Sequence, residues 1–149
     1  MVIQRIQSVY LLIAVILMAI FAFFPALSFH LADKTVIYGA LECGRAGHMH
    51  VDPLMLVLII LISFLALIDI FLYKNLQRQM TVCFVDIIIG IAMLAAIVVQ
   101  AIVVNNREGW TVSWQWYLLL PVFSIIFLML AHKAMSNDKK KLRDSDRLR

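Results

Sequence analysis

Two acidic residues lie inside long apolar stretches of the chain. Asp69 falls within LMLVLIILISFLALIDIFLY (54–73), and Asp86 falls within a second apolar stretch at about 80–104. A charged carboxylate is costly in lipid and is usually paired with another polar group. A short polar turn joins the two stretches, so we expect both acids near the same end of a helix pair, within reach of Arg5. The chemistry open to such a pair is the binding of a proton or a cation.

Two interpretations of these acids remain open. In the first, Asp69 and Asp86 relay protons or cations; in the second, they form an ionic clamp with Arg5 that fixes helix packing. A stripe at helical spacing continues from Asp86 through Gly90, Met93, Ile97 and Gln100. We therefore expect an intramembrane polar cluster of Arg5, Asp69, Asp86 and Gln100. The clamp is the simpler interpretation, because no chain of polar residues crosses the apolar middle of the stretches.

A second group of reactive side chains lies in CGRAGHMHVD, between the first two apolar stretches. Its metal-ligand types are Cys43, His48, His50 and Asp52. Zinc accepts such a set, and copper suits the thiolate and the imidazoles. The spacing matches no strong metal-site signature, so an ordinary polar loop is the favoured interpretation, and we expect no cofactor.

The positions of cysteine and histidine exclude several kinds of redox protein. A disulfide needs Cα atoms within about 7 Å, whereas a hydrocarbon core about 30 Å thick is expected between Cys43 and Cys83. A quinone-reducing thiol oxidoreductase would need paired cysteines outside the membrane. Haem between helices would need two histidines at one depth, whereas His30 is expected at the outer end of the first stretch and His132 at the inner end of the fourth. Since no Ser/His/Asp or P-loop pattern occurs either, we expect no enzyme.

The elements that carry these residues follow from hydropathy. Of the 149 residues, 64% are hydrophobic and 15% are charged, whereas a soluble domain is nearer one half apolar and one quarter charged. Each of four stretches reaches the roughly 20 residues that a helix needs to cross a bilayer. They lie at about 8–29, 54–73, 80–104 and 114–134. The predicted fold class is an all-α membrane protein: one four-transmembrane-helix bundle at 1–134 and a basic tail at 135–149.

The first stretch shares one feature with a signal peptide. Ala26-Leu27-Ser28 fits the small-x-small pattern of a cleavage site. However, the apolar run from Val9 to Leu27 is longer than the roughly 7–15 residues of a signal peptide, and Pro25 lies close to the cut. A retained membrane helix is therefore the prediction.

Basic residues predict the orientation of the bundle. Of the 13 Lys and Arg residues, ten fall in the N-terminus, the KNLQRQ turn and the C-terminal segment that begins at Lys133. The positive-inside rule then places both termini in the cytoplasm. The tail residues expected to anchor this orientation and to contact anionic lipid are Lys139, Lys140, Lys141, Arg143, Arg147 and Arg149.

Aromatic residues mark the opposite surface of the membrane. GWTVSWQWY supplies Trp110, Trp114, Trp116 and Tyr117. Trp and Tyr favour the membrane interface, so an aromatic belt is the favoured interpretation and a docking or quinone-stacking surface is the alternative. In the loop at 30–52, two runs of β-forming residues around Asp33-Lys34 predict a small β-hairpin.

The segment IQRIQSVYLL (3–12) resembles the start of an uncharacterised family of small four-helix inner-membrane proteins from Bacteroidetes. Members of that family begin Met-Ile-Gln-Arg-Ile-Gln-Ser, followed by a hydrophobic and an aromatic residue, and this chain has an additional Val2. The four-helix layout and the basic tail are similar over the whole chain. The resemblance implies a fold and a compartment, and it assigns no catalytic residues.

Two classes of function follow from these observations. The favoured one is a non-enzymatic accessory or scaffold protein that lies in the lipid bilayer and contacts other membrane proteins or copies of itself, and no nucleic acid. The alternative is a small transporter or ion-conducting protein that uses Asp69 and Asp86. Small four-helix drug exporters have their key acid in the first helix, and the first helix expected here has none.

Overall fold

The computed structural model describes residues 2–31, 34–41, 43–45, 48–72, 75–106 and 109–147. The helices among them are α1 (Val2–Ala22), α2 (Pro53–Phe71), α3 (Leu76–Asn105) and α4 (Leu119–Arg147). The strands are β1 (Pro25–Leu31), β2 (Lys34–Gly39), β3 (Cys43–Arg45), β4 (His48–His50) and β5 (Thr111–Trp114). A 3-10 turn, Trp116–Leu118, leads from β5 into α4.

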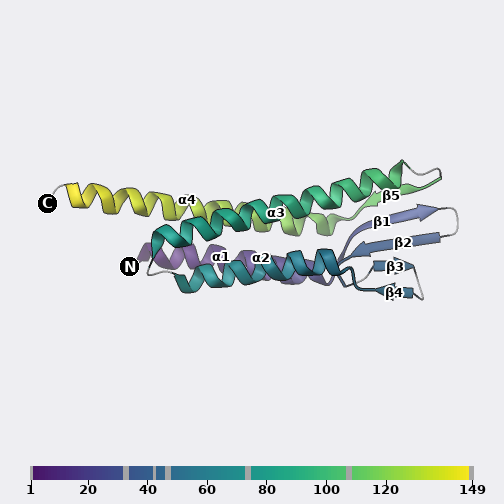
Figure 1. The fold of residues 1–149 in the computed structure, drawn as a ribbon, viewed down its shortest axis with the longest axis horizontal. Helices are drawn as coiled ribbons and strands as arrows, with labels where there is room; N and C mark the ends of the chain where they lie inside the picture. Colours follow the sequence, from purple (N-terminus) through teal and green to yellow (C-terminus); the bar gives the residue numbers. More distant parts are fainter. Residues whose placement is uncertain are drawn as a thin grey trace.

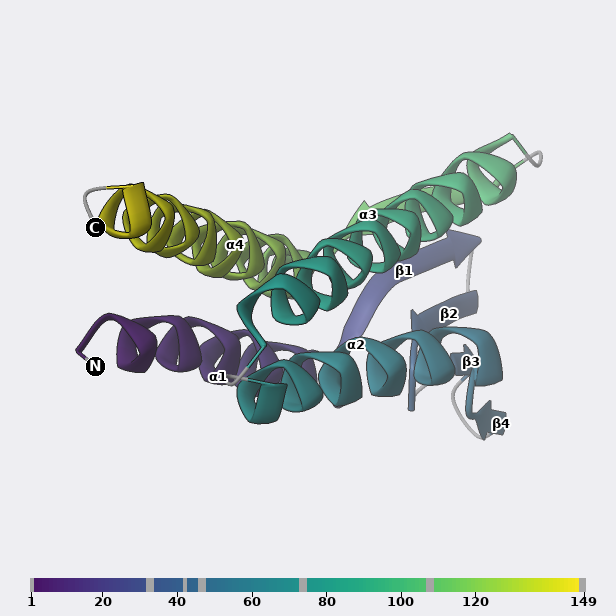
Figure 2. The same cartoon turned by 60° about the vertical axis from the view of Figure 1, so that its left-hand side comes forward.

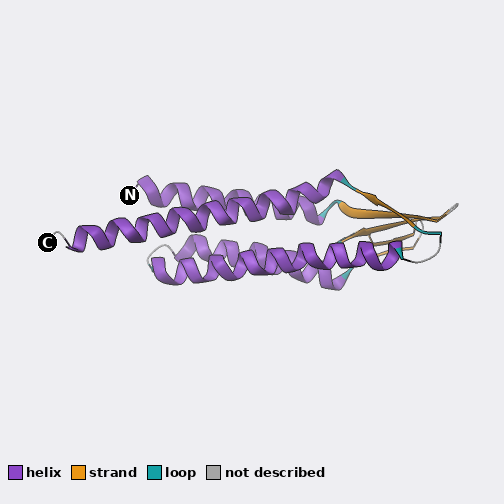
Figure 3. Cartoon of the chain, turned by 90° about the horizontal axis from the view of Figure 1, so that it is seen from above, coloured by secondary structure: helices purple, strands orange, loops and turns teal. Residues whose placement is uncertain are grey.

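The four helices form one elongated bundle. Each helix packs on two neighbours, in the order α1, α2, α3, α4 and back to α1. Figures 1 and 3 show the start of α1, the end of α2, the start of α3 and the end of α4 at one end of the bundle, which we call the terminal end. The strands lie at the opposite end, which we call the sheet end. Figure 2 shows the sheet beside the start of α2 and the end of α3.

The bundle has the dimensions and the surface of a membrane protein. Three helices, α2, α3 and the segment Trp116–Asp144 that contains most of α4, are long and apolar enough to cross a bilayer. A shorter apolar helix covers Ile6–Ala22 in α1. Large apolar side chains face outward along the bundle, among them Val57, Phe64, Ile88 and Val99. Water would disfavour such a surface, whereas lipid accommodates it.

The first helix is shorter than the predicted stretch at 8–29. It ends at Ala22, where the amides of Phe23 and Phe24 make tight bonds to Ile20 and Phe21. Pro25 follows; it has no N–H, and it drives the preceding residue out of the helical region. The remaining apolar residues, Pro25–Leu31, form strand β1 instead. The prediction of helix up to residue 29 was therefore wrong.

The predicted hairpin is part of a larger sheet. The strand order is β4-β3-β2-β1-β5, and all pairs are antiparallel. The hairpin β1–β2 lies inside this order, and β5 comes from the loop between α3 and α4. Ala26, Leu27 and Phe29 of β1, with Ala40 just after β2, are buried in one cluster with Met18, Phe21 and Ile97 of the helices. A lone hairpin is marginally stable, and here the helix ends cover it.

The last helix lies further along the chain than the predicted stretch at 114–134. Thr111–Trp114 is strand β5, and α4 begins only at Leu119. At the other end α4 continues through most of the predicted tail to Arg147. Figure 1 shows it extending beyond the start of α3. The predicted basic tail is thus a helical extension of the bundle over the described residues.

Candidate functional site

The two intramembrane acids lie in the terminal half of the bundle. Asp69 of α2 and Asp86 of α3 are both 0% exposed. Asp86 lies close enough to Asp69 for their charges to interact. The thiol of Cys83, one turn before Asp86 on α3, lies within the same range of both carboxyl groups. The packing of α2 on α3 thus gathers three ionisable side chains in one buried region, which we call the carboxyl pair site.

Neither carboxyl group has a donor in the part of the chain that the structure describes. All four side-chain oxygens of Asp69 and Asp86 are buried and without a hydrogen-bond partner there. The backbone of Arg5 lies in α1, but its side chain is outside the described residues, so the expected ionic clamp stays a prediction. A buried polar group without a partner is costly. The oxygens of the carboxyl pair site can therefore still accept hydrogen bonds or bind a proton or cation.

The donors near the carboxyl pair site are committed to the backbone of neighbouring helices. The Gln79 side-chain amide donates to the carbonyl oxygen of Asp69 at 2.9 Å, which ties α3 to α2. The Cys83 thiol donates to the carbonyl oxygen of Leu128 at 3.4 Å, which ties α3 to α4. Such interhelical bonds stabilise membrane bundles by roughly 0.6–2 kcal/mol each. They fix the geometry around the two acids without neutralising them.

Two further buried polar contacts join α1 to α4. The Gln7 side-chain amide donates to the carboxylate of Asp138. Ser124 donates to the carbonyl oxygen of Ala14 at 3.1 Å. Sequence reasoning missed Gln7, Gln79 and Ser124. Helical spacing could have found the first two: Gln79 lies two turns before Asp86, and Gln7 shares a face with Leu11, Ala14 and Met18, all of which are buried.

The stripe along α3 is buried up to its last member. Asp86, Gly90, Met93 and Ile97 are buried, but Gln100 is exposed and Ala101 takes the buried position. Gln100 is thus no part of the carboxyl pair site, from which it is separated by almost four helical turns. At Gly90 the helices approach closely, since a Cβ there would lie 3.0 Å from Cγ1 of Ile125. The small residue sets the distance between α3 and α4.

The residues considered for metal binding are divided between three positions of the sheet end. Cys43 begins β3 and is half-buried, and Asp52 caps α2, accepting bonds from the amides of Leu54 (3.0 Å) and Met55 (3.3 Å). The backbones of His48 and His50 lie in β4, but their side chains are outside the described residues. Among the described side chains there is no group of three metal ligands. Asp52 has a structural task that the sequence interpretation did not assign.

Asp52 also shapes the electrostatics of the sheet end. Burial, with the charge of Asp52 as the second cause, raises the pKa of the Cys43 thiol, while a backbone hydrogen bond at Gly39 lowers it. Burial and a side-chain hydrogen bond with Asp52 raise the pKa of Tyr38. Both groups are therefore held in their neutral forms near neutral pH, which makes Cys43 a weak nucleophile.

The aromatic residues surround the junction of β5 and α4. Trp114 and Trp116 are exposed, and Trp110 and Tyr117 are half-buried. Tyr117 stacks on Phe24, with ring centroids 4.3 Å apart, and Trp116 lies against Tyr117 at 4.2 Å. The cluster thus connects the end of α1 to the start of α4 at the sheet end. Both the interfacial and the docking interpretation require such an exposed position.

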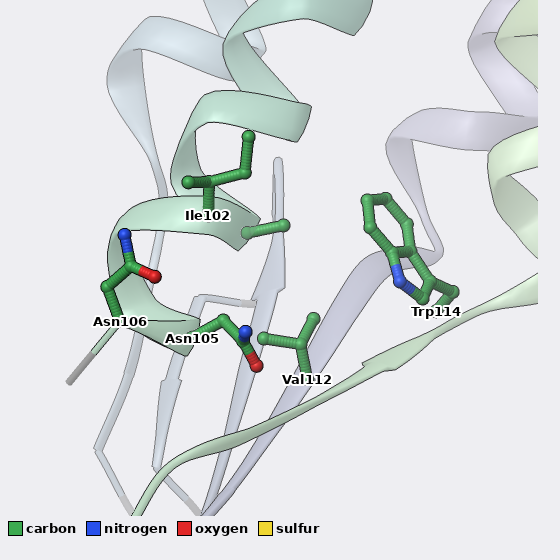
Figure 4. Close-up of a pocket in the computed structure, with 6 residues that line it drawn as sticks. Ile102, Asn105, Asn106, Val112 and Trp114 are labelled. Carbon is green, nitrogen blue, oxygen red and sulfur yellow. The ribbon is translucent and has the colours of Figure 1, made fainter. Parts of the chain in front are cut away.

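A pocket of about 210 Å³ opens beside this aromatic cluster. Figure 4 shows Asn105 and Ile102 of α3 on one side, with Val112 and the Trp114 indole of β5 on the other. Ala101 and Asn106 complete the lining. The two amides offer donors and acceptors beside an indole ring, so the pocket suits a polar group that also contacts an aromatic face. The sequence interpretation did not single out Asn105 or Asn106.

The basic residues of the predicted tail lie on the extension of α4. Lys139, Lys140, Lys141 and Arg143 are exposed there. The Lys139 ammonium donates to the side-chain oxygen of Gln77 on α3. Arg147 is the last residue of α4, with its side chain outside the described residues, and Arg149 lies outside them altogether.

Comparison with known proteins gives a family and no activity. A search of curated proteins finds no match. The family model described as "Domain of unknown function (DUF4293)" matches residues 3–148, nearly the whole chain. The match spans all four helices and the five strands, so it covers both the carboxyl pair site and the sheet end. The chain therefore belongs to the DUF4293 family.

Proposed function

We propose that this chain is a non-enzymatic integral protein of the bacterial inner membrane, an accessory or scaffold subunit that acts through contacts with other membrane proteins or with copies of itself. In this proposal α1 is the fourth membrane span, and both termini are cytoplasmic. The resemblance of Ile3–Leu12 to Bacteroidetes proteins supports a bacterial inner membrane as the compartment. The proposal requires no cofactor, catalytic residue or nucleic acid.

The observation that carries this proposal is the apolar packing between the carboxyl pair site and the sheet end. From Asp86 to Ala101, 15 residues or about 22 Å along α3, the buried positions are Gly90 or apolar residues. The facing positions of α2, which are Met55, Ile59, Ile62 and Ala66, are apolar as well. A path for ions needs polar groups or water along its length. The described core supports a packed bundle rather than a conduit.

The sheet end supplies a surface suited to partner contacts. Gln115 donates through its backbone to Ala26 at 3.4 Å and through its side chain to Ser28 at 2.9 Å, so the strands are firmly attached to the bundle. Trp114 and Trp116 are exposed beside this attachment. Tryptophan is enriched where proteins bind each other. We therefore assign the partner contacts to the edge formed by β5 and the start of α4.

Cross-linking in native membranes tests this assignment. The tagged chain is cross-linked, purified and mapped by mass spectrometry, beside a Trp114→Ala, Trp116→Ala variant and a Phe64→Ala, Val99→Ala control that changes exposed positions on the spans. We expect cross-links from the sheet end to one membrane protein, or to a second copy, that the tryptophan variant loses and the control retains. Equal recovery from all three proteins would contradict the assignment.

A second candidate function rests on the unpartnered carboxyl groups. A transporter or ion-conducting protein would use Asp69 and Asp86 as the groups that bind a proton or cation, and their free acceptor oxygens favour such a role. Flux in proteoliposomes separates the candidates. A scaffold gives no proton or cation flux above that of empty vesicles, whereas wild-type flux that Asp86→Asn abolishes in a stable protein would establish the transporter.

A further inference from the structure

A second polar site lies at the terminal end, outside the carboxyl pair site. A pocket of about 220 Å³ is bounded by Met80 of α3 and by Ser136, Lys139, Lys140 and Arg143 of α4. It exists because α4 continues as a helix beyond the start of α3 (Figure 1). A loose tail would not bring these basic side chains to one place. We call this hollow the basic pocket.

The charges of the basic pocket are of one sign. Three of its five lining side chains are cationic, and none is acidic. Lys139 is held over the start of α3 by its bond to Gln77. Of the neighbouring acids on α4, Asp138 accepts a bond from Gln7 of α1, and neither Asp138 nor Asp144 lines the pocket. The positive charge there is therefore available to an external anion.

The position of the basic pocket selects the kind of anion. Met80 is in the second turn of α3, just after the polar residues Gln77 and Arg78. One turn further, Phe84 and Val85 are exposed apolar side chains on the same helix. The pocket thus lies where the polar end of the bundle meets its lipid-facing surface. A ligand with an anionic head and an apolar tail matches both sides of this boundary.

We propose that the basic pocket binds the phosphate of an anionic phospholipid. Lys140 and Arg143 pair with the phosphate oxygens, where the guanidinium of arginine offers two parallel donors. The Ser136 hydroxyl donates to the same group, and Met80 packs against the first carbons of the acyl chains. Free phosphate shares the head chemistry and lacks the tail, so the two sources can be separated. This site is independent of the proposed accessory function.

Lipid titration of the full chain in detergent tests this site. Native mass spectrometry counts bound phosphatidylglycerol, with phosphatidylcholine of the same acyl chains as the neutral comparison. The test variant is Lys139→Gln, Lys140→Gln, Arg143→Gln. The matched control, Arg78→Gln, Lys133→Gln, Lys141→Gln, removes the same charge from exposed positions that do not line the pocket. Melting temperatures in phosphatidylcholine show whether both variants are folded.

The proposal predicts a specific pattern. Wild type binds phosphatidylglycerol in preference to phosphatidylcholine, the test variant binds it about tenfold more weakly or worse, and the control stays within about twofold of wild type. Equal losses of phosphatidylglycerol binding in both variants would mean that the lipid is held by general charge attraction, and the proposed site would be overturned. An unchanged test variant would overturn it as well. If inorganic phosphate alone displaces phosphatidylglycerol, the site takes free phosphate and the lipid assignment is wrong.

Discussion

A carboxyl group that is buried without a hydrogen-bond donor destabilises the folded state. Asp69 and Asp86 are such groups among the described residues, while the nearby amide and thiol donate to backbone carbonyls. Burying a charge without compensation costs several kcal/mol. The acids therefore do not hold the bundle together by themselves, and the residues that donate across helices do.

This distinction predicts the effect of neutralising the acids. In Asp69→Asn or Asp86→Asn the shape is kept, and one buried charge is lost beside the remaining carboxyl group. We expect the melting temperature in detergent to stay equal or to rise. Gln79→Leu removes the hydrogen bond to the backbone carbonyl of Asp69. It should lower the melting temperature by the equivalent of roughly 1 kcal/mol. An ionic clamp with Arg5 predicts a loss in both Asn variants instead, because it removes one member of a buried pair.

The residues of the predicted intramembrane polar cluster differ in how well the sequence places them. Asp69 and Asp86 stand out because the residues around them are apolar. Gln100 was placed on the stripe because 97 and 100 are one helical step apart. However, steps of three and four residues are both compatible with 3.6 residues per turn, and packing decides between them. In α3 the buried position after Ile97 lies four residues further on, so Ala101 is buried and Gln100 is exposed.

The thiol of Cys43 offers a test of the charge at the sheet end. Asp52→Asn retains the helix cap, since asparagine caps as well as aspartate, but it removes the negative charge that contributes to raising the pKa of Cys43. The pKa should fall, so below that pKa a larger fraction is thiolate and alkylation is faster. Since burial is the larger cause, we expect at most about a fivefold increase, the factor for roughly 1 kcal/mol.

The measurement is the alkylation rate of Cys43 by maleimide as a function of pH, followed by intact mass. Cys83 is 0% exposed and should not react in the folded protein. Asp144→Asn, on the extension of α4, is the control and should leave the rate unchanged. A slower reaction in Asp52→Asn would mean that the Asp52 charge does not act on the thiol.

The elements of this chain show where hydropathy is informative and where it is not. Apolar length predicted the spans that became α2 and α3 to within a few residues. The same criterion extended the first helix over Ala26–Phe29, which is buried strand, because an apolar run alone does not distinguish buried strand from helix. Pro25 is the local signal that separates the two. It could have been used to end the helix.

The contact between α3 and α4 is set by Gly90, and this yields a prediction for the helix pair. A Cβ at Gly90 would lie 3.0 Å from Cγ1 and 3.3 Å from Cδ1 of Ile125. Gly90→Leu should force the helices apart and destabilise the bundle by roughly 1–3 kcal/mol. Gly90→Ala should have a small effect, because the gain in helix propensity of about 1 kcal/mol offsets the crowding. The melting temperature in detergent is the measurement.

Two further variants test whether the destabilisation in Gly90→Leu comes from the contact with Ile125. Ile88→Leu, at an exposed position of the same helix, should have no effect on the melting temperature. Adding Ile125→Ala to Gly90→Leu should recover part of the loss, because the added side chain then fills the space that isoleucine leaves. If the double variant melts lower than Gly90→Leu by the full cost of Ile125→Ala alone, the crowding lies elsewhere.

At the scale of the whole molecule, the sheet is the feature that the sequence did not predict in full. Its strand β1 pairs with β2, its neighbour in sequence, and with the edge strand β5, which comes after α3: His30 lies opposite Thr35 on one side and opposite Thr111 on the other. The first pairing follows from a local turn and was predicted as a hairpin. The second joins residues that are 81 apart and depends on how the helices between them pack, so no local pattern contains it.

The arrangement of the ends predicts how the chain lies in the membrane. The start of α1, the start of α3 and the extension of α4 share the terminal end, and the sheet lies at the other (Figures 1 and 3). Most of the basic residues fall at the terminal end, which the positive-inside rule assigns to the cytoplasm. Lys34→Cys at the sheet end and Lys141→Cys at the terminal end form a matched pair, since both lysines are exposed. Both native cysteines are replaced by serine or alanine in these variants.

In spheroplasts, a membrane-impermeant maleimide should label Lys34→Cys directly and Lys141→Cys only after the membrane is permeabilised. The physical reason is that a charged reagent does not cross the hydrocarbon core. Labelling of Lys141→Cys in intact spheroplasts, with Lys34→Cys protected, would invert the orientation. Labelling of both without permeabilisation would mean that the two ends lie on one side. In that case α2, α3 and α4 do not all cross the membrane, because these are the three helices that lie between residues 34 and 141 in the chain.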